Sequence, residues 1–251
     1  DNPYFNMLMR PYKDVDEVKL AHRLQQEEEG ISKLYLGRLL YDKPNASKKR
    51  ILEYYQKALF HEIKVAKCYI AEVLLHQKNF DKALFQLLTS IEYSLSLFLL
   101  GHYNLNLQDG SQSIKKAIDY YQQAAELGFD EAMFHLAMVL SNQNQIQYGP
   151  HYCLNWIKKA AKKGHTQSLL HLIAHYENNN EEQYLDWLSL AAYKGDKHCK
   201  YYLACDYKDG IRLKQDINKA KYWFELAKKS GCRKSAEALK NINSDNDTQC
   251  F

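Results

Sequence analysis

Small and aliphatic residues recur along the chain at the spacing of an α-helix. One copy begins at Ala132 and continues with Leu136, Ala137 and Leu140. These offsets of four, five and eight residues place the four side chains on one helical face. Small residues let a neighbouring helix approach closely, and large ones fill the space beside it. The pattern predicts a helix that is packed closely on one side.

This face is repeated through most of the sequence. The residue that follows its first aliphatic position lies at 37, 71, 101, 137, 173, 204 and 240. The steps between copies are therefore 34, 30, 36, 36, 31 and 36 residues. Self-similarity at such a period is typical of repeat proteins, in which each unit packs against its neighbours.

A second pattern ends at glycine and lies between the copies of the first. The glycines are at positions 128, 164, 195 and 231, each with an alanine four residues before it and an aromatic residue eight before it. Glycine readily adopts the left-handed conformation that ends many helices. Lysines in the preceding turn, such as Lys162 and Lys163, complement the helix dipole. Each repeat is therefore predicted to contain two helices, the second of which ends at glycine.

The combined pattern is small-x-x-x-Leu-Gly-x-x-Tyr, followed by Lys-Ala-x-x-Trp-Tyr-x-x-Ala-Ala-x-x-Gly. Residues 116–128 and 219–231 match its second half well, whereas Glu62 and Glu92 stand where glycine is expected in the first two copies. The pattern resembles the Sel-one-like repeat family, relatives of the tetratricopeptide repeat. The resemblance covers about residues 30–242.

The expected fold is all-α. The resemblance implies a right-handed α/α superhelix (solenoid) of about six helical hairpins with N- and C-terminal capping helices. The expected parts are a lead-in and capping helix at 1–29, hairpins at 30–62, 63–92, 93–128, 129–164, 165–195 and 196–231, a cap at 232–242 and a disordered tail at 243–251.

Composition agrees with a helical chain and limits its partners. The sequence has only 4 Pro and 10 Gly among 251 residues, and 46% of its residues are hydrophobic. Its net charge of +4 is too small to indicate a polyanionic partner. The apolar runs fall well short of the roughly 18 residues that a membrane span needs. We therefore expect no nucleic-acid partner and no insertion into a membrane.

The sequence contains no phosphate-binding or nucleophile motif, so we expect neither a cofactor nor an enzyme. His171 and His175 lie one helical turn apart but have no evident third metal ligand. No metal is therefore expected, although a metal-dependent enzyme with a site around His135, His171 and His175 is the less favoured alternative. Cys153 and Cys199 occupy small-residue positions, which predicts buried, reduced thiols.

Function is expected on the variable positions of the first helices. In tetratricopeptide-like hairpins, the positions two before and one after the recurring small residue face a concave groove. The alternative is that the aromatic residues among them pack against the second helix of the same hairpin. The candidate protein-binding residues are Tyr35, Arg38, Tyr69, Glu72, His102, His135, Met138, His171, His175 and Tyr202.

These residue types favour a non-catalytic scaffold or adaptor, a monomer that binds a protein partner through its concave groove. The resemblance, with a composition typical of an AT-rich bacterial genome, implies a secreted effector or a regulator that binds and inhibits another effector. A cytosolic location is expected, including the cytosol of a host cell after secretion. A scaffold associated with the periplasm or envelope is the alternative.

Overall fold

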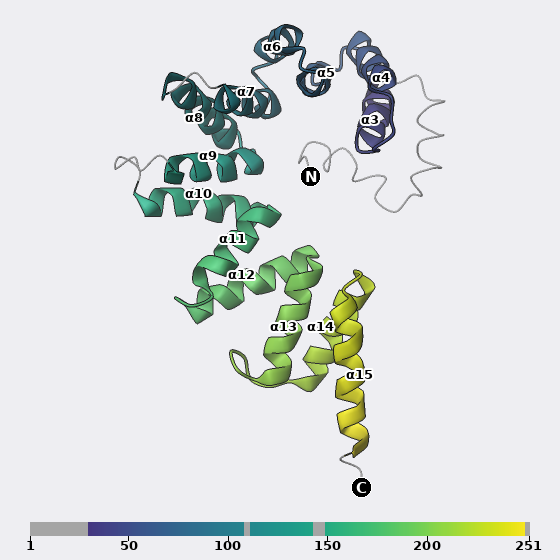
Figure 1. Cartoon of the computed structure of the whole chain (residues 1–251), viewed down its shortest axis with the longest axis vertical. Helices are drawn as coiled ribbons and strands as arrows, with labels where there is room; N and C mark the ends of the chain where they lie inside the picture. Colours follow the sequence, from purple (N-terminus) through teal and green to yellow (C-terminus); the bar gives the residue numbers. More distant parts are fainter. Residues whose placement is uncertain (1–29, 108–110, 143–148, 249–251) are drawn as a thin grey trace. The chain divides into compact units, whose positions relative to one another are not determined.

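A computed structural model of the chain describes residues 30–107, 111–142 and 149–248. These residues form thirteen α-helices and no strand, which confirms the all-α prediction (Figure 1). The lead-in and capping helix expected at 1–29 lie outside the described residues. The chain divides into two compact units, the first ending at Val139 and the second beginning at Leu140.

The helices of the first unit follow one another in pairs. Their bounds are α3 Gly30–Tyr41, α4 Lys48–Phe60, α5 Ala66–His76, α6 Phe80–Leu88, α7 Ser94–Asn106 and α8 Ser111–Glu126. Helix α9, Asp130–Asn142, crosses the boundary between the units. In each pair the helices pack together: α3 with α4, α5 with α6, and α7 with α8.

The second unit continues the alternation. Its helices are α10 Pro150–Lys163, α11 Thr166–Tyr176, α12 Glu181–Lys194, α13 Lys197–Asp209, α14 Ile217–Lys229 and α15 Arg233–Thr248. Each packs against the next in the chain. Each of the six ranges expected to form a hairpin thus contains two helices. Helix α15 extends to Thr248, into the range 243–251 that was expected to form a disordered tail.

Glycines end several second helices as the pattern predicts. Gly164 and Gly195 have φ of 98° and 113°, and the N–H groups of each glycine and the next residue donate to carbonyls of the last turn. Where the first hairpin lacks the glycine, Glu62 adopts the same left-handed region with φ of 62°. The first hairpin therefore keeps this turn geometry without glycine, whereas Glu92 in the second hairpin does not have a positive φ.

Two tyrosines explain the small residues of the first helices. A Cβ atom on Gly37 would lie 2.5 Å from Cε1 of Tyr55, and one on Gly101 would lie 2.7 Å from Cδ1 of Tyr121. Both rings are fully buried. Each tyrosine comes from the second helix of the same hairpin, so glycine allows the ring to lie directly on the first helix. Cys153 and Cys199 are buried as predicted.

Candidate protein-binding surface

Arg38 and Glu72, both predicted, meet between α3 and α5. Arg38 Nη1 lies 3.2 Å from Glu72 Oε2, and its Nη2 lies 3.6 Å from a carboxylate oxygen of Asp42. The guanidinium also stands over the ring of Tyr41, 5.0 Å from its centroid. Arg38 of α3 and Glu72 of α5 thus form an ion pair that links the first two hairpins.

The environment of this ion pair changes the pKa values of both groups. Burial raises the pKa of Glu72, and the positive charge of Arg38 opposes that shift. Burial lowers the pKa of Arg38, but the carboxylates of Glu72 and Asp42 outweigh it, so the net shift is upward. The half-buried arginine therefore stays charged and holds the glutamate beside it.

Tyr35 and Tyr69 do not face a groove. Both are buried, Tyr69 with 1% of its surface exposed. The ring of Tyr69 is stacked on that of Tyr55 in α4, with the centroids 5.5 Å apart. Tyr35 lies in a stretch of α3, residues 32–37, that is buried on all sides. The predicted exposure of these two residues is therefore wrong.

Tyr69 is buried because it packs against Tyr55, which belongs to the second helix of the preceding hairpin. His135, which occupies the same repeat position as Tyr69, stacks on Tyr121 of α8 with the ring centroids 5.8 Å apart. In both cases the residue packs against the second helix of the preceding hairpin. The alternative considered from the sequence, packing within the same hairpin, names the right kind of contact but the wrong partner.

Three histidines, His76, His102 and His135, lie beyond the ion pair on the first helices α5, α7 and α9. The ring of His76 lies 5.9 Å from that of Tyr41, and the rings of His102 and His135 lie 6.3 Å apart. Burial lowers the pKa of His102, and the charge of His76 adds to that shift. His135 Nε2 lies 3.9 Å from a carboxylate oxygen of Glu131.

We name Arg38, Glu72, His76, His102 and His135 the polar stripe. It crosses α3, α5, α7 and α9, all of them first helices of their hairpins. His76 was not predicted from the sequence; it lies one helical turn after Glu72, outside the two selected repeat positions. Met138, also predicted, lies half-buried on α9, one turn from Phe134.

The predicted residues of the second unit are on α11 and α13. Burial lowers the pKa of His171, and His175 contributes further. His175 is exposed, with its ring 4.7 Å from that of Tyr176. Tyr202 is also exposed and contacts Tyr201 on its own helix, with ring centroids 5.6 Å apart. In the described part of the chain, no three His, Cys, Asp or Glu side chains converge as metal ligands.

Comparison with known proteins assigns the repeat. The family model described as the Sel1 repeat matches residues 94–129, 130–165 and 198–232. Three Sel1 repeats are thus recognised within this chain. The three matches correspond to the expected hairpins at 93–128, 129–164 and 196–231, within two residues at each end. No curated protein matches the sequence.

Solved structures share the fold of this chain at low sequence identity. A Sel1 repeat protein from Oxalobacter formigenes is 19% identical with a TM-score of 0.61, over 90% of this chain and 98% of that one. An immunity protein from Pseudomonas aeruginosa is 18% identical with a TM-score of 0.54, over 88% of both chains. A protective antigen of uropathogenic Escherichia coli is 20% identical with a TM-score of 0.54, over 90% of this chain.

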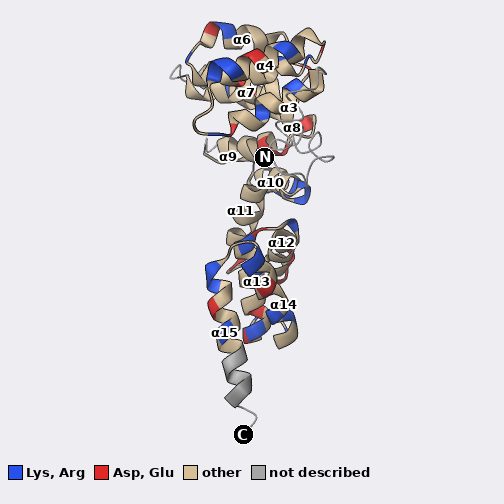
Figure 2. Cartoon of the chain, turned by 90° about the vertical axis from the view of Figure 1, so that its right-hand side faces the viewer, with Lys and Arg blue, Asp and Glu red and all other residues tan. Residues whose placement is uncertain are grey.

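The last comparison covers 51% of the Escherichia coli chain, so this chain spans about half the length of that protein. None of the helices in the described ranges is long and apolar enough to cross a membrane. In the view of Figure 2, basic and acidic residues are interspersed over the helices of each unit.

Proposed function

We propose that this protein is a non-catalytic scaffold that binds a protein partner through the polar stripe. The Sel1 repeat fold is typical of protein–protein interaction scaffolds. The observation that carries the proposal is the continuity of the stripe: charged and imidazole side chains follow one another across four successive first helices. Of the residue types in the stripe, arginine is enriched at protein interfaces.

The stripe offers chemistry that suits a folded protein or a peptide. Arg38 presents hydrogen-bond donors, Glu72 acceptors, and the exposed ring of His102 both an apolar face and a polar edge. The ion pair between Arg38 and Glu72 is already formed, so little side-chain entropy is lost when a partner covers it. Met138 and His135 continue the surface on α9.

The finer part of the proposal concerns the role of the partner. Two solved structures with the same fold are named immunity proteins of Pseudomonas aeruginosa. By analogy, the partner of this chain is an effector protein, which the chain binds and inhibits.

The test measures partner binding with variants of the stripe. A partner is first captured from the source cells and identified by crosslinking mass spectrometry, and its affinity is then measured with purified protein. His102→Ala and Glu72→Gln should each weaken binding, together by at least about tenfold, because both side chains lie at the centre of the stripe.

The matched control is His198→Ala, because His198 is an exposed histidine of α13 outside the stripe. It should bind the partner as the unchanged protein does, and all variants should keep the same helical circular dichroism. Full affinity in the stripe double variant would contradict the proposed binding surface.

A further inference from the structure

The second unit concentrates positive charge at the turns between its hairpins. Each turn runs from the end of a second helix through its glycine into the next first helix, at residues 161–168, 192–199 and 228–235. The basic residues of these stretches are Lys162, Lys163, Lys194, Lys197, Lys228, Lys229, Arg233 and Lys234, and their one acid is Asp196. We name the eight basic residues the basic edge.

The charges of the basic edge are not neutralised within the chain as far as the structure describes it. All eight residues are exposed. Among the described residues, none of the eight forms an ion pair with a carboxylate. Asp196 is engaged with the backbone, since its Oδ1 accepts hydrogen bonds from the N–H groups of His198 and Cys199 at 2.9 and 2.8 Å. The positive charges therefore face the surroundings of the unit.

The repeat itself does not require positive charge at these turns. The corresponding stretch around Gly128, residues 125–132, contains Glu126, Asp130 and Glu131 and no basic residue. The hairpins therefore pack with either sign of charge at this position.

The helix dipole explains only part of the basic edge. Lysines in the last turn of α10, α12 and α14 complement the negative ends of these helices. Lys197, Arg233 and Lys234, in contrast, lie in the first turns of α13 and α15, where the dipole makes a positive charge unfavourable. These three residues lower the stability of their helices slightly, which favours a role outside the fold.

The three turns follow one another along one side of the unit. A Cβ atom on Gly164 would lie 3.3 Å from Cδ of Lys194, so the first two turns are in contact. Lys200 in the first turn of α13 donates from Nζ to Oγ of Ser230, 2.8 Å away, which joins the second turn to the third. The basic edge is therefore one continuous surface.

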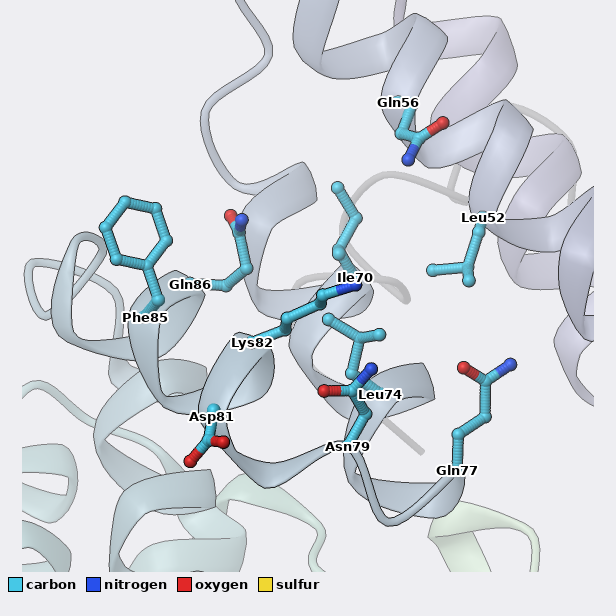
Figure 3. A pocket seen from close by; sticks show the side chains of 10 residues that line it. All are labelled: Leu52, Gln56, Ile70, Leu74, Gln77, Asn79, Asp81, Lys82, Phe85 and Gln86. Atoms are coloured by element: carbon cyan, nitrogen blue, oxygen red, sulfur yellow. The ribbon is translucent and has the colours of Figure 1, made fainter.

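A groove in the first unit shows no such preference for one charge. It has a volume of about 540 Å³, and Figure 3 shows Leu52 on its α4 side and Phe85 on its α6 side. Asp81 and Lys82, which have opposite charges, both line it. The chemistry of a partner can therefore be inferred from the basic edge but not from this groove.

The surroundings of the basic edge indicate a protein partner. The adjoining helical turns have mixed charge, with Lys158, Lys159 and Lys200 but also Glu225 and Glu237, so the positive strip is narrow. A nucleic-acid duplex is broad and would meet these acids as well. Tyr193, next to Lys194, is 76% exposed, and tyrosine is enriched where proteins bind proteins.

We propose that the basic edge is a further interaction surface, which binds an acidic segment of a protein. The lysine ammonium groups attract its carboxylates and speed their association, and Tyr193 adds apolar contact. The surface is separate from the polar stripe, which lies in the first unit.

The test uses a labelled peptide of about 20 glutamates as the probe, at about 50 mM ionic strength, where charge attraction is only weakly screened. Fluorescence anisotropy measures its binding to the full chain. The variant Lys162→Gln, Lys194→Gln, Lys229→Gln removes one lysine from each turn. It should bind the peptide about tenfold more weakly, because three exposed ion pairs account for a loss of that size.

The matched control is Lys115→Gln, Lys116→Gln, Lys214→Gln, which removes three exposed lysines outside the basic edge. Because both variants lose the same net charge, their difference reports the position of the lysines. The control should bind the peptide within about twofold of the unchanged protein, and both variants should keep its helical circular dichroism. Equal weakening in the two variants, or no binding by the unchanged protein, would overturn the proposal.

Two further measurements examine the place and the class of the partner. Carbodiimide coupling of the bound peptide, followed by mass spectrometry, should give crosslinks to lysines of the basic edge, and crosslinks confined to other lysines would overturn the proposal. Single-stranded DNA of the same charge is the competing polyanion. Tighter binding of this DNA than of the peptide, lost in the basic-edge variant, would assign the surface to a nucleic acid instead.

These outcomes are distinguishable from those of the proposed function. His102→Ala should bind the glutamate peptide as the unchanged protein does, because His102 lies in the first unit. Since the probe replaces the captured partner, failure of either proposal leaves the other to be judged on its own measurement.

Discussion

Tyr55 and Tyr121 each occupy the middle of a three-layer contact. One side of the ring lies on a glycine of the same hairpin, Gly37 or Gly101, and the other side lies near a residue of the next hairpin. This arrangement packs the second helix against two successive first helices at once. The side chain at one position thus determines both the distance within a hairpin and the spacing to the next.

This contact predicts the effect of adding one methyl group. Gly101→Ala should lower the free energy of unfolding by about 1–3 kcal/mol, because the new Cβ would meet the Tyr121 ring at 2.7 Å and the buried ring has little room to move. Chemical denaturation followed by circular dichroism measures this change. Gly149→Ala is the control, because no atom lies within 4 Å of its Cβ position; equal stability of the two variants would contradict the explanation.

At the scale of the elements, helix pairs could be predicted from the sequence, but the direction of individual side chains could not. The periodicity of small and aliphatic residues depends on close packing, which every hairpin needs. Arg38 and Glu72 lie one position after the recurring small residue and meet in an ion pair between α3 and α5, while their role in binding a partner stays a prediction. Tyr69 was not, because neighbouring positions on a helix differ by about 100° and the sequence does not show which adjacent helix fills each direction.

The left-handed residues that follow the second helices predict how substitutions there change the free energy of unfolding. Glu62 has a φ of 62°, a conformation that costs a side-chain-bearing residue more than glycine. Glu62→Gly should therefore raise the free energy of unfolding by about 0.5–1 kcal/mol. The opposite kind of change, glycine to a residue with a side chain, can be made at Gly195. Gly195→Ala should lower the free energy of unfolding by about 1 kcal/mol because φ is 113° there. The added Cβ meets no atom within 4 Å, so packing does not contribute to this loss.

Denaturant titration of both variants measures these shifts. A lower midpoint for Glu62→Gly would show that the Glu62 side chain makes a stabilising interaction larger than the backbone cost. Gly195→Ala reports the free-energy cost of the backbone conformation alone, because the added Cβ contacts no other atom.

Within each unit, the described helix packing is mainly between neighbours in the chain, as for α3 with α4 and α13 with α14. Stability in such an architecture is a sum of local terms, unlike that of a protein with one central core. The proposed binding surface follows the same division: the polar stripe lies in the first unit, on the first helices of four successive hairpins. The residues that bind a partner can therefore vary from hairpin to hairpin while the buried repeat positions stay the same.

Because helices pack mainly against their neighbours in the chain, a destabilising substitution should affect only its own hairpin and the adjacent ones. Gly101→Ala should speed amide hydrogen exchange in α7, α8 and the helices packed against them, while exchange in α13, α14 and α15 stays as in the unchanged protein. Gly195→Ala should show the reverse, with faster exchange in α12 and α13 and no change in α3 and α4. Exchange measured by mass spectrometry on peptides from each helix distinguishes these patterns. A uniform increase over both units in either variant would mean that the chain unfolds as one cooperative body, and the variants would then report global stability, not the strength of single hairpins.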